Sequence, residues 1–424
     1  MKTESLSAVR AAAACDTVVL DCGLTVKVKP MMDYSGVFAI YGTRFGSVDL
    51  DFELDGKKVH LPAGVAHFLE HKMFESEEGD AFAKFAKTGA SANAYTSFDK
   101  TCYLFAATQQ VEESLDILLS MVGNPYFTEA TIAKEQGIIG QEIKMYDDSP
   151  DWRILTALFG CMYNNHPVRN DIAGTVESIA QITPEMLYDC CKAFYNPSNM
   201  VLAVAGNITT QQVLDACERA NLPAKTVEAH RLMVEEPETL ACERKEFKMS
   251  LAKPCLGVGF KEIPIEGAKP EIICDLLTEL ICGGMTPLYR ELYDKGLVNP
   301  GFDGEFLVLD GCTCFMFTGE TDQPDLVREM LLKEIERQRR EGVDEELFTL
   351  CKNQMYGELL QDLENIEDTA TALAGSFFRR RSIADELEAL AVLTKEEVDE
   401  MLQKMLQPER SATVIIWPEE EADK

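Results

Sequence analysis

The chain has 424 residues, a length that favours two domains of about 200 residues each over a single hydrophobic core. Hydrophobic residues make up 46% of the chain and charged residues 26%, which is ordinary for a soluble globular protein. The formal net charge of −32 excludes a general nucleic-acid binder, because phosphate-backbone binding needs a basic excess to displace counterions.

Two further absences in the sequence bear on where the protein works. No apolar run approaches the roughly 18 residues of a membrane span. The apolar run near the N-terminus, at residues 11–14, is too short and too weakly apolar for a signal peptide. The cysteines are spread from Cys15 to Cys351, mostly inside apolar stretches, so free buried thiols are expected rather than a disulfide framework. We therefore expect a cytoplasmic protein with no membrane partner.

The predicted elements run through one order in the first half of the chain. A strand over Val37–Tyr41 precedes an apolar helix over Val65–Phe74 and a shorter helix over Ala81–Lys87. An alternating strand pair that includes Thr101–Phe105 follows, and then two long helices, one of which covers Phe127–Glu142.

The second half repeats this order. Its corresponding segments are Leu256–Phe260, Ile272–Cys282, Pro287–Asp294, Thr313–Phe317 and Val343–Glu358. Such a repeat indicates a duplication. The sequence predicts an α+β fold with two homologous domains, each a mainly antiparallel sheet with helices packed on one side. We place the domains at residues 1–221 and 241–424, with a polar linker containing two prolines at 222–240.

The apolar helix over Val65–Phe74 carries the pattern His67-Phe68-Leu69-Glu70-His71. Positions i and i+4 share one helix face, so both imidazoles can reach a single ion, with Glu70 near the same face. This H-x-x-E-H arrangement is typical of inverted zincins. The alternative, two core histidines beside a buried glutamate, is less favourable because an unpaired buried carboxylate is costly and a cation would satisfy it.

A catalytic zinc also needs a third protein ligand and an open position. The best candidate is Glu142, with Glu135 seven residues earlier on the same helix face, where it could orient a ligand imidazole. From spacing alone, an ordinary charged stripe is the stronger interpretation, since glutamate is common on helices.

Across nearly its whole length the chain resembles the pitrilysin or insulinase family of zinc peptidases. The family's histidine motif matches at His67, Glu70 and His71, and its paired glutamates match at Glu135 and Glu142. Further matching stretches are Ser91–Thr96, His166–Pro167 and Phe194–Met200. The resemblance implies Zn²⁺ as cofactor, with His67, His71 and Glu142 as ligands, and catalytic roles for Glu70 as general base and Glu135 as the residue behind a ligand.

The same resemblance implies a zinc endopeptidase in which the chain forms half of a clamshell chamber. An extended peptide would pair with the edge strand near Asn93 and Ala94. Short unstructured peptides would enter such a chamber, and the acidic balance of the chain favours cationic ones.

One part of the family pattern is missing. Active assemblies of the family also present an Arg and a Tyr that stabilise the oxyanion and hold the substrate carbonyl. In this chain the register of Lys295–Leu297 places Tyr293 and Asn299 at those positions. We therefore expect a heterodimer with a related subunit that supplies Arg and Tyr. A self-sufficient homodimer and a noncatalytic scaffold subunit remain the alternatives.

Overall fold

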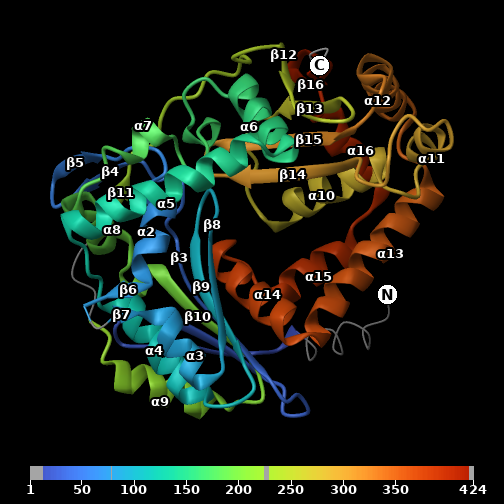
Figure 1. Cartoon of the computed structure of the whole chain (residues 1–424). Coiled ribbons are helices and arrows are strands. Elements are labelled where there is room, and N and C mark those ends of the chain that lie inside the picture. The colour runs from blue at the N-terminus through green and yellow to red at the C-terminus, as the bar shows by residue number, and fades with distance from the viewer. Residues whose placement is uncertain (1–12, 78, 224–228, 420–424) are drawn as a thin grey trace. The chain divides into compact units, whose positions relative to one another are not determined.

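The computed structural model describes residues 13–77, 79–223 and 229–419, and the chain forms two compact units from interleaved segments (Figure 1). Unit 1 comprises Met1–Ile143, Asp171–Met233 and Leu359–Asp385. Unit 2 comprises Lys144–Asn170, Val234–Glu358 and Glu386–Lys424. Each unit is a layer of helices on a sheet, as the α+β prediction requires.

Unit 1 is built on a six-stranded sheet in the order β1-β2-β10-β3-β9-β8. Its neighbouring strands are antiparallel except for the parallel pair β2–β10. The strands are β1 (Asp16–Val19), β2 (Thr25–Pro30), β10 (Met200–Gly206), β3 (Val37–Thr43), β9 (Thr101–Ala107) and β8 (Ser91–Thr96).

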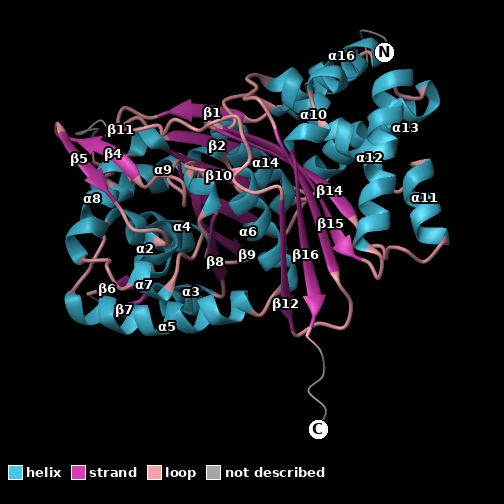
Figure 2. Cartoon of the chain, turned by 90° about the horizontal axis from the view of Figure 1, so that it is seen from above, coloured by secondary structure: helices cyan, strands magenta, loops and turns pink. Residues whose placement is uncertain are grey.

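Unit 2 has a five-stranded sheet in the order β12-β16-β13-β15-β14, whose strands run side by side in Figure 2. Here too one pair, β12–β16, is parallel and the others are antiparallel. The strands are β12 (Arg244–Met249), β16 (Ser411–Pro418), β13 (Cys255–Lys261), β15 (Cys312–Glu320) and β14 (Asp303–Leu309). The order matches β2-β10-β3-β9-β8 strand for strand, which confirms the predicted duplication.

Helices pack on both faces of the sheet in unit 1, so the expectation of helices on one side is incomplete. One face carries α2 (Val65–Met73), α4 (Val111–Gly123) and α9 (Thr210–Ala220). The opposite face carries α14 (Ile366–Phe378), which comes from late in the chain and packs on β10 and β3. A Cβ at Gly42 of β3 would lie 2.8 Å from the Phe378 ring, so glycine permits this close approach.

Unit 2 shows the complementary exchange. Its strand β13 is covered by α6 (Pro150–Met162), a helix from the first half of the chain. Gly257 and Gly259 face this helix: a Cβ at either position would lie 2.8 Å from a side chain of α6. In each unit, one helix that packs on the sheet therefore comes from the other half of the sequence. The domain division at residues 222–240 describes the order along the chain and stays a prediction.

The predicted linker includes a short strand, and its residues 224–228 lie outside the described part of the chain. Ala229–Arg231 forms β11, which pairs with β4 (Asp51–Leu54) beside β5 (Lys57–His60). Farther along, Glu236 accepts hydrogen bonds from the backbone N–H groups of residues 164–166 and from Lys261. Burial acts to raise the pKa of Glu236, but these hydrogen bonds lower it to about 2.

Two expectations from composition meet different outcomes. All fourteen cysteines are free thiols, which confirms that they form no disulfide framework. The stretch Ala268–Asp294, which holds α10 (Ala268–Cys282) and α11 (Pro287–Asp294), is long and apolar enough by composition to cross a membrane. The expectation of no such stretch was therefore too strict. Its apolar window is 67% buried within the described chain, as in a core helix.

A buried carboxylate follows β13. The side chain of Glu262 is 0% exposed, and its Oε1 accepts the Leu406 N–H at 2.5 Å. Its Oε2 lies 3.9 Å from Arg410 Nη1 and has no hydrogen-bond partner among the described residues. Burial raises the pKa of Glu262 to about 7, although Leu406, Arg410 and Arg339 oppose the rise.

Replacing Glu262 is therefore expected to change how stability depends on pH. An unfolded glutamate titrates near 4.5, so between pH 4.5 and 7 the native state holds the extra proton. The free energy of unfolding then falls with rising pH by up to about 3 kcal/mol. We expect the free energy of unfolding of Glu262→Gln to be about 1–3 kcal/mol higher than that of the parent at pH 8 and about equal to it at pH 4.5. Urea unfolding at both pH values measures this, with the exposed neighbour Glu409→Gln as control. An equal gain at both pH values contradicts it.

Candidate metal centre

The helix α2 is positioned by its first turn and by burial. Its N-terminal cap is Gly64 at φ +92°, and a Cβ there would lie 2.5 Å from the carbonyl oxygen of Ala173, so only glycine fits. Eight of the nine residues of α2 are buried, including His67 and Glu70. The motif thus sits on a helix that packing holds on nearly every side.

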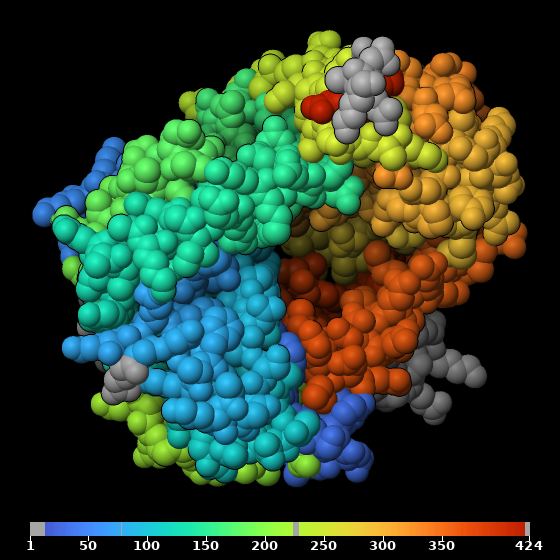
Figure 3. Space-filling model, in the orientation of Figure 1, coloured from blue at the N-terminus to red at the C-terminus, as the bar shows by residue number. Residues whose placement is uncertain are grey.

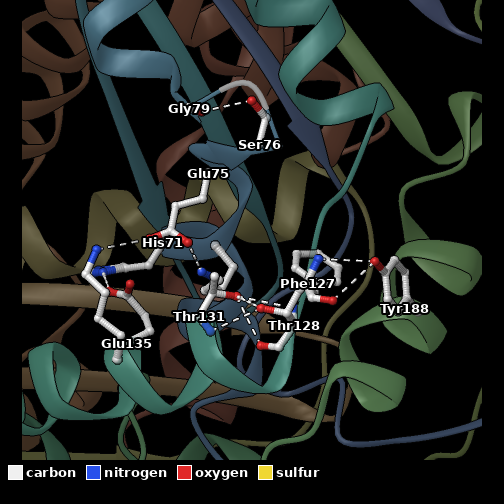
Figure 4. A network of polar contacts seen from close by, with 11 residues as sticks. His71, Glu75, Ser76, Gly79, Phe127, Thr128, Thr131, Glu135 and Tyr188 are labelled. Carbon is white, nitrogen blue, oxygen red and sulfur yellow. Dashed lines mark hydrogen bonds and ion pairs between the residues drawn. The ribbon is translucent and has the colours of Figure 1, made fainter.

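The two predicted glutamates lie on α5 (Glu129–Asp147), whose start is fastened by a polar network (Figure 4). The N–H of Phe127 donates to the hydroxyl of Tyr188 on α8 (Pro184–Phe194) at 3.1 Å. The side chains of Thr128 and Thr131 bond each other at 3.2 Å, and Thr128 also accepts the N–H of Thr131. These contacts hold the first turn of the helix that carries Glu135 and Glu142.

His67, His71 and Glu142, the three ligands that the family resemblance implies, lie close together in the structure. His67 Nε2 lies 3.6 Å from Glu142 Oε1, and His71 Nε2 lies 3.4 Å from Glu142 Oε2. One ligand atom from each residue falls within 4.8 Å of the others. Two ligands at about 2.1 Å from a tetrahedral zinc stand about 3.4 Å apart, so this donor set fits zinc in spacing and in chemistry.

Glu135 stands behind one of the imidazoles. Its Oε1 lies 3.0 Å from His71 Nδ1, and its side chain is 7% exposed (Figure 4). A carboxylate accepts, so Nδ1 carries the proton and the lone pair of Nε2 is directed at the cluster. Burial acts to lower the pKa of His71, but the bond to Glu135 and the nearby carboxylates raise it overall.

Glu70 lies beside the three candidate ligands without belonging to their group. Its Oε2 accepts a hydrogen bond from Thr96 Oγ1 of β8 at 2.6 Å. Burial raises the pKa of Glu70, while the neighbouring His67 and the bond from Thr96 act against the rise. Sequence reasoning did not find this role of Thr96. Its only signal was that Thr96 ends the strand that resembles the family's substrate-lining strand.

Asn93 and Ala94 lie on β8, the terminal strand of the six-stranded sheet as described. The N–H of Ala94 donates to the Asn93 side-chain oxygen at 2.9 Å rather than to β9. In an antiparallel pair the backbone groups alternate between the two sides, so from this contact we infer that Ala94 directs its N–H and C=O away from β9. Substrate binding by these two residues stays a prediction.

The described residues of unit 2 contain no matching cluster. The positions that correspond to His67, Glu70 and His71 are Glu279, Cys282 and Gly283. Within the described residues, the only group of three that could hold a metal ion is His67, His71 and Glu142. Among the residues that the structure describes, the candidate metal centre therefore lies in the first half of the duplicated fold.

Comparisons with known proteins agree with this geometry. The family model described as Insulinase (Peptidase family M16) matches residues 61–176, and the Peptidase M16 inactive domain matches residues 181–355. The uncharacterized zinc protease YmfH of Bacillus subtilis (strain 168) is 38% identical over 407 residues, covering 93% of this chain and 95% of YmfH. The zinc protease PqqE of Helicobacter pylori is 23% identical, covering 95% of this chain and 93% of PqqE.

A solved structure is similar over the same span. The crystal structure of a protein described as an M16-like peptidase from Alicyclobacillus acidocaldarius has a TM-score of 0.93 and 35% identity, covering 96% of this chain and 98% of that one. Relatives named as zinc proteases and a donor set with zinc spacing together identify Zn²⁺ as the cofactor. The chain belongs to the insulinase family of zinc peptidases, peptidase family M16.

Proposed function

We propose that the chain is a zinc endopeptidase that hydrolyses short unstructured peptides. The observation that carries this proposal is the place of Glu70, which is buried next to the ligand cluster and held by Thr96 rather than by the cluster. When bound, zinc supplies Lewis acidity that polarises the scissile carbonyl and makes water easier to deprotonate.

Glu70 would act as general base. With Oε2 engaged by Thr96, its Oε1 is the oxygen left to take the proton from water and pass it to the departing amine. The raised pKa brings this carboxylate nearer to the working pH, which suits a group that must both accept and return a proton. Glu135 would keep His71 in the tautomer that binds the metal.

The open edge of β8 supports capture of an extended peptide. A substrate strand would pair with the outward N–H and C=O of Ala94, after the Asn93 side chain releases that N–H. Main-chain pairing of this kind takes peptides of many sequences and excludes folded proteins, whose backbones are already paired. The net charge of −32 favours cationic peptides.

We further propose that a related partner subunit supplies the missing Arg and Tyr. Asn299, at the Tyr position, is committed to a turn: its Nδ2 donates to Glu320 at 2.8 Å and its Oδ1 accepts from Gly301 at 2.9 Å. Tyr293, at the Arg position, stacks on Tyr289 with ring centroids 6.2 Å apart. Pitrilysin, at 18% identity and a TM-score of 0.73, has the same fold over 97% of this chain, which covers 45% of pitrilysin. A chain of about half that length is compatible with one half of the chamber that we propose.

Peptide hydrolysis with and without partners tests this proposal. We expect the zinc-loaded chain alone to cleave a quenched fluorescent peptide library at least a hundredfold more slowly than the same chain mixed with an Arg- and Tyr-bearing relative, because a missing oxyanion donor typically costs 10²–10³-fold in rate. Full activity of the chain alone, lost in Glu70→Gln, would favour the homodimer. A zinc-loaded chain that stays silent with every relative would favour the scaffold.

A further inference from the structure

We propose that Lys72 is a positioning residue for the zinc ligands, acting through Glu75 and Lys134 to fix α2 against α5. The proposal rests on the zinc site of the proposed function but not on peptidase activity. Lys72 follows the ligand His71 in the chain, and Lys134 precedes Glu135. Lys72, Glu75 and Lys134 lie outside the residues that the family motif assigns to the metal or to catalysis.

The burial of Lys72 is the first observation. Its side chain is 0% exposed on a helix that is otherwise apolar on the same side, yet lysine is almost never fully buried unless it is paired. Its ammonium donates to Glu75 Oε2 on β6 (Glu75–Ser76), the segment directly after α2. The ion pair therefore connects the last turn of α2 to β6, the strand that follows it.

Glu75 extends this tie to α5. Its other oxygen, Oε1, lies 3.5 Å from Lys134 Nζ. Figure 3 shows α5 directly beside the segment that follows α2, and Figure 4 shows Glu75 close to the His71–Glu135 pair. One carboxylate thus bridges an ammonium from each helix.

The two connections between the helices are parallel. One joins His71 to Glu135, and the other joins Lys72 to Lys134 through Glu75. They are one residue apart on each helix, so together they limit rotation and sliding of α2 against α5. That relative position sets how His67 and His71 meet Glu142, because the histidines come from one helix and the glutamate from the other.

The positive charge of Lys72, taken alone, is expected to weaken zinc binding, whereas a positioning role strengthens it. An ammonium next to a ligand residue repels a divalent cation, and that repulsion is stronger at a site partly shielded from water. If Lys72 acted only as a charge, removing it would tighten zinc binding. If it positions the ligands, removing it loosens zinc binding, as loss of an outer partner typically does by 10–100-fold. The sign of the change therefore separates the two roles.

The test measures zinc affinity of the whole chain by competition with a chelating dye, without substrate. Lys72→Met keeps the length and apolar stem of the side chain and removes its ammonium. We expect its apparent Kd for zinc to rise at least tenfold. The double variant Lys72→Met/Glu75→Gln leaves no unpaired buried charge, so it folds even if a single variant does not. It is expected to show the same loss, whereas the exposed Lys87→Met on α3 (Ala81–Thr88) is expected to bind zinc as the parent does.

Two results would overturn the proposal. Zinc affinity equal to or tighter than the parent's in folded Lys72→Met and in the double variant would show that Lys72 does not position the ligands. A lower melting temperature of the zinc-free protein with unchanged zinc affinity would make its role purely structural. The zinc titration uses no substrate, so its result does not depend on whether the chain is an active peptidase. Absence of peptidase activity would count against the proposed function only.

Discussion

Glu70→Gln is expected to lower kcat by about 10²–10⁴-fold while zinc affinity stays within about threefold of the parent's, because a general base contributes a factor of that size and a non-ligand leaves the metal in place. The amide keeps the volume of the side chain and can still accept the hydrogen bond from Thr96. What it loses is the ability to take a proton. Single-turnover cleavage of a fluorescent peptide, with zinc measured on the same sample, checks both parts.

The control for Glu70 is its partner on β8. Thr96→Val removes the 2.6 Å hydrogen bond but leaves the carboxylate, so we expect a loss of about tenfold, smaller than that of Glu70→Gln. More than a tenth of the parent activity in Glu70→Gln would rule out a role as base. Loss of zinc in that variant would instead make Glu70 a ligand.

The histidine motif could be predicted from sequence because its geometry is local. An i, i+4 spacing on a helix fixes the relative place of two side chains whatever surrounds the helix. The helix over Val65–Phe74 could be recognised from its apolar residues and the Pro62 and Gly64 before it, and α2 ends within one residue of that prediction. The repeat of strand order was equally accessible, since it depends on comparing the chain with itself.

The third ligand was not accessible in that way. Glu142 and Glu135 are spaced like the residues of any charged helix stripe. Their contact with α2 distinguishes them from such a stripe, and the sequence does not show that contact, since His71 and Glu135 are 64 residues apart. Only the family resemblance pointed to them beforehand. The burial of Lys72 illustrates the same limit, because a lysine in an apolar helix gives no sign of whether a partner such as Glu75 reaches it.

The exchange of α6 and α14 between the two sheets was also beyond sequence reasoning. An apolar helix face shows that a helix packs, not which sheet it covers. Each of these helices lies within one half of the sequence but packs on the sheet of the other half. Gly257 and Gly259 were the available signal. Two glycines in a strand that is otherwise apolar indicate that something approaches one face closely, but they do not name it.

The two glutamates of α5 offer a graded prediction, because they lie seven residues apart on one helix and have different contacts. Glu142→Gln removes a ligand that reaches both histidines, at 3.6 and 3.4 Å. Structural zinc sites bind with about 10–16 kcal/mol, so one lost ligand of three corresponds to about 3–5 kcal/mol. We therefore expect zinc affinity to fall by about 10²–10³-fold or more.

Glu135→Gln on the same helix serves as the matched variant. It keeps all three ligands and loses only the charge behind His71 Nδ1, so zinc affinity is expected to fall by about 10–100-fold. Competition titrations of both proteins with the same chelator give the order directly. If Glu135→Gln lost as much affinity as Glu142→Gln, the carboxylate beside His71 Nδ1 would be as important to the metal as the one between the two Nε2 atoms. The division of α5 into one ligand and one orienting residue would then fail, and with it the argument that the hydrogen bond to His71 only selects the tautomer.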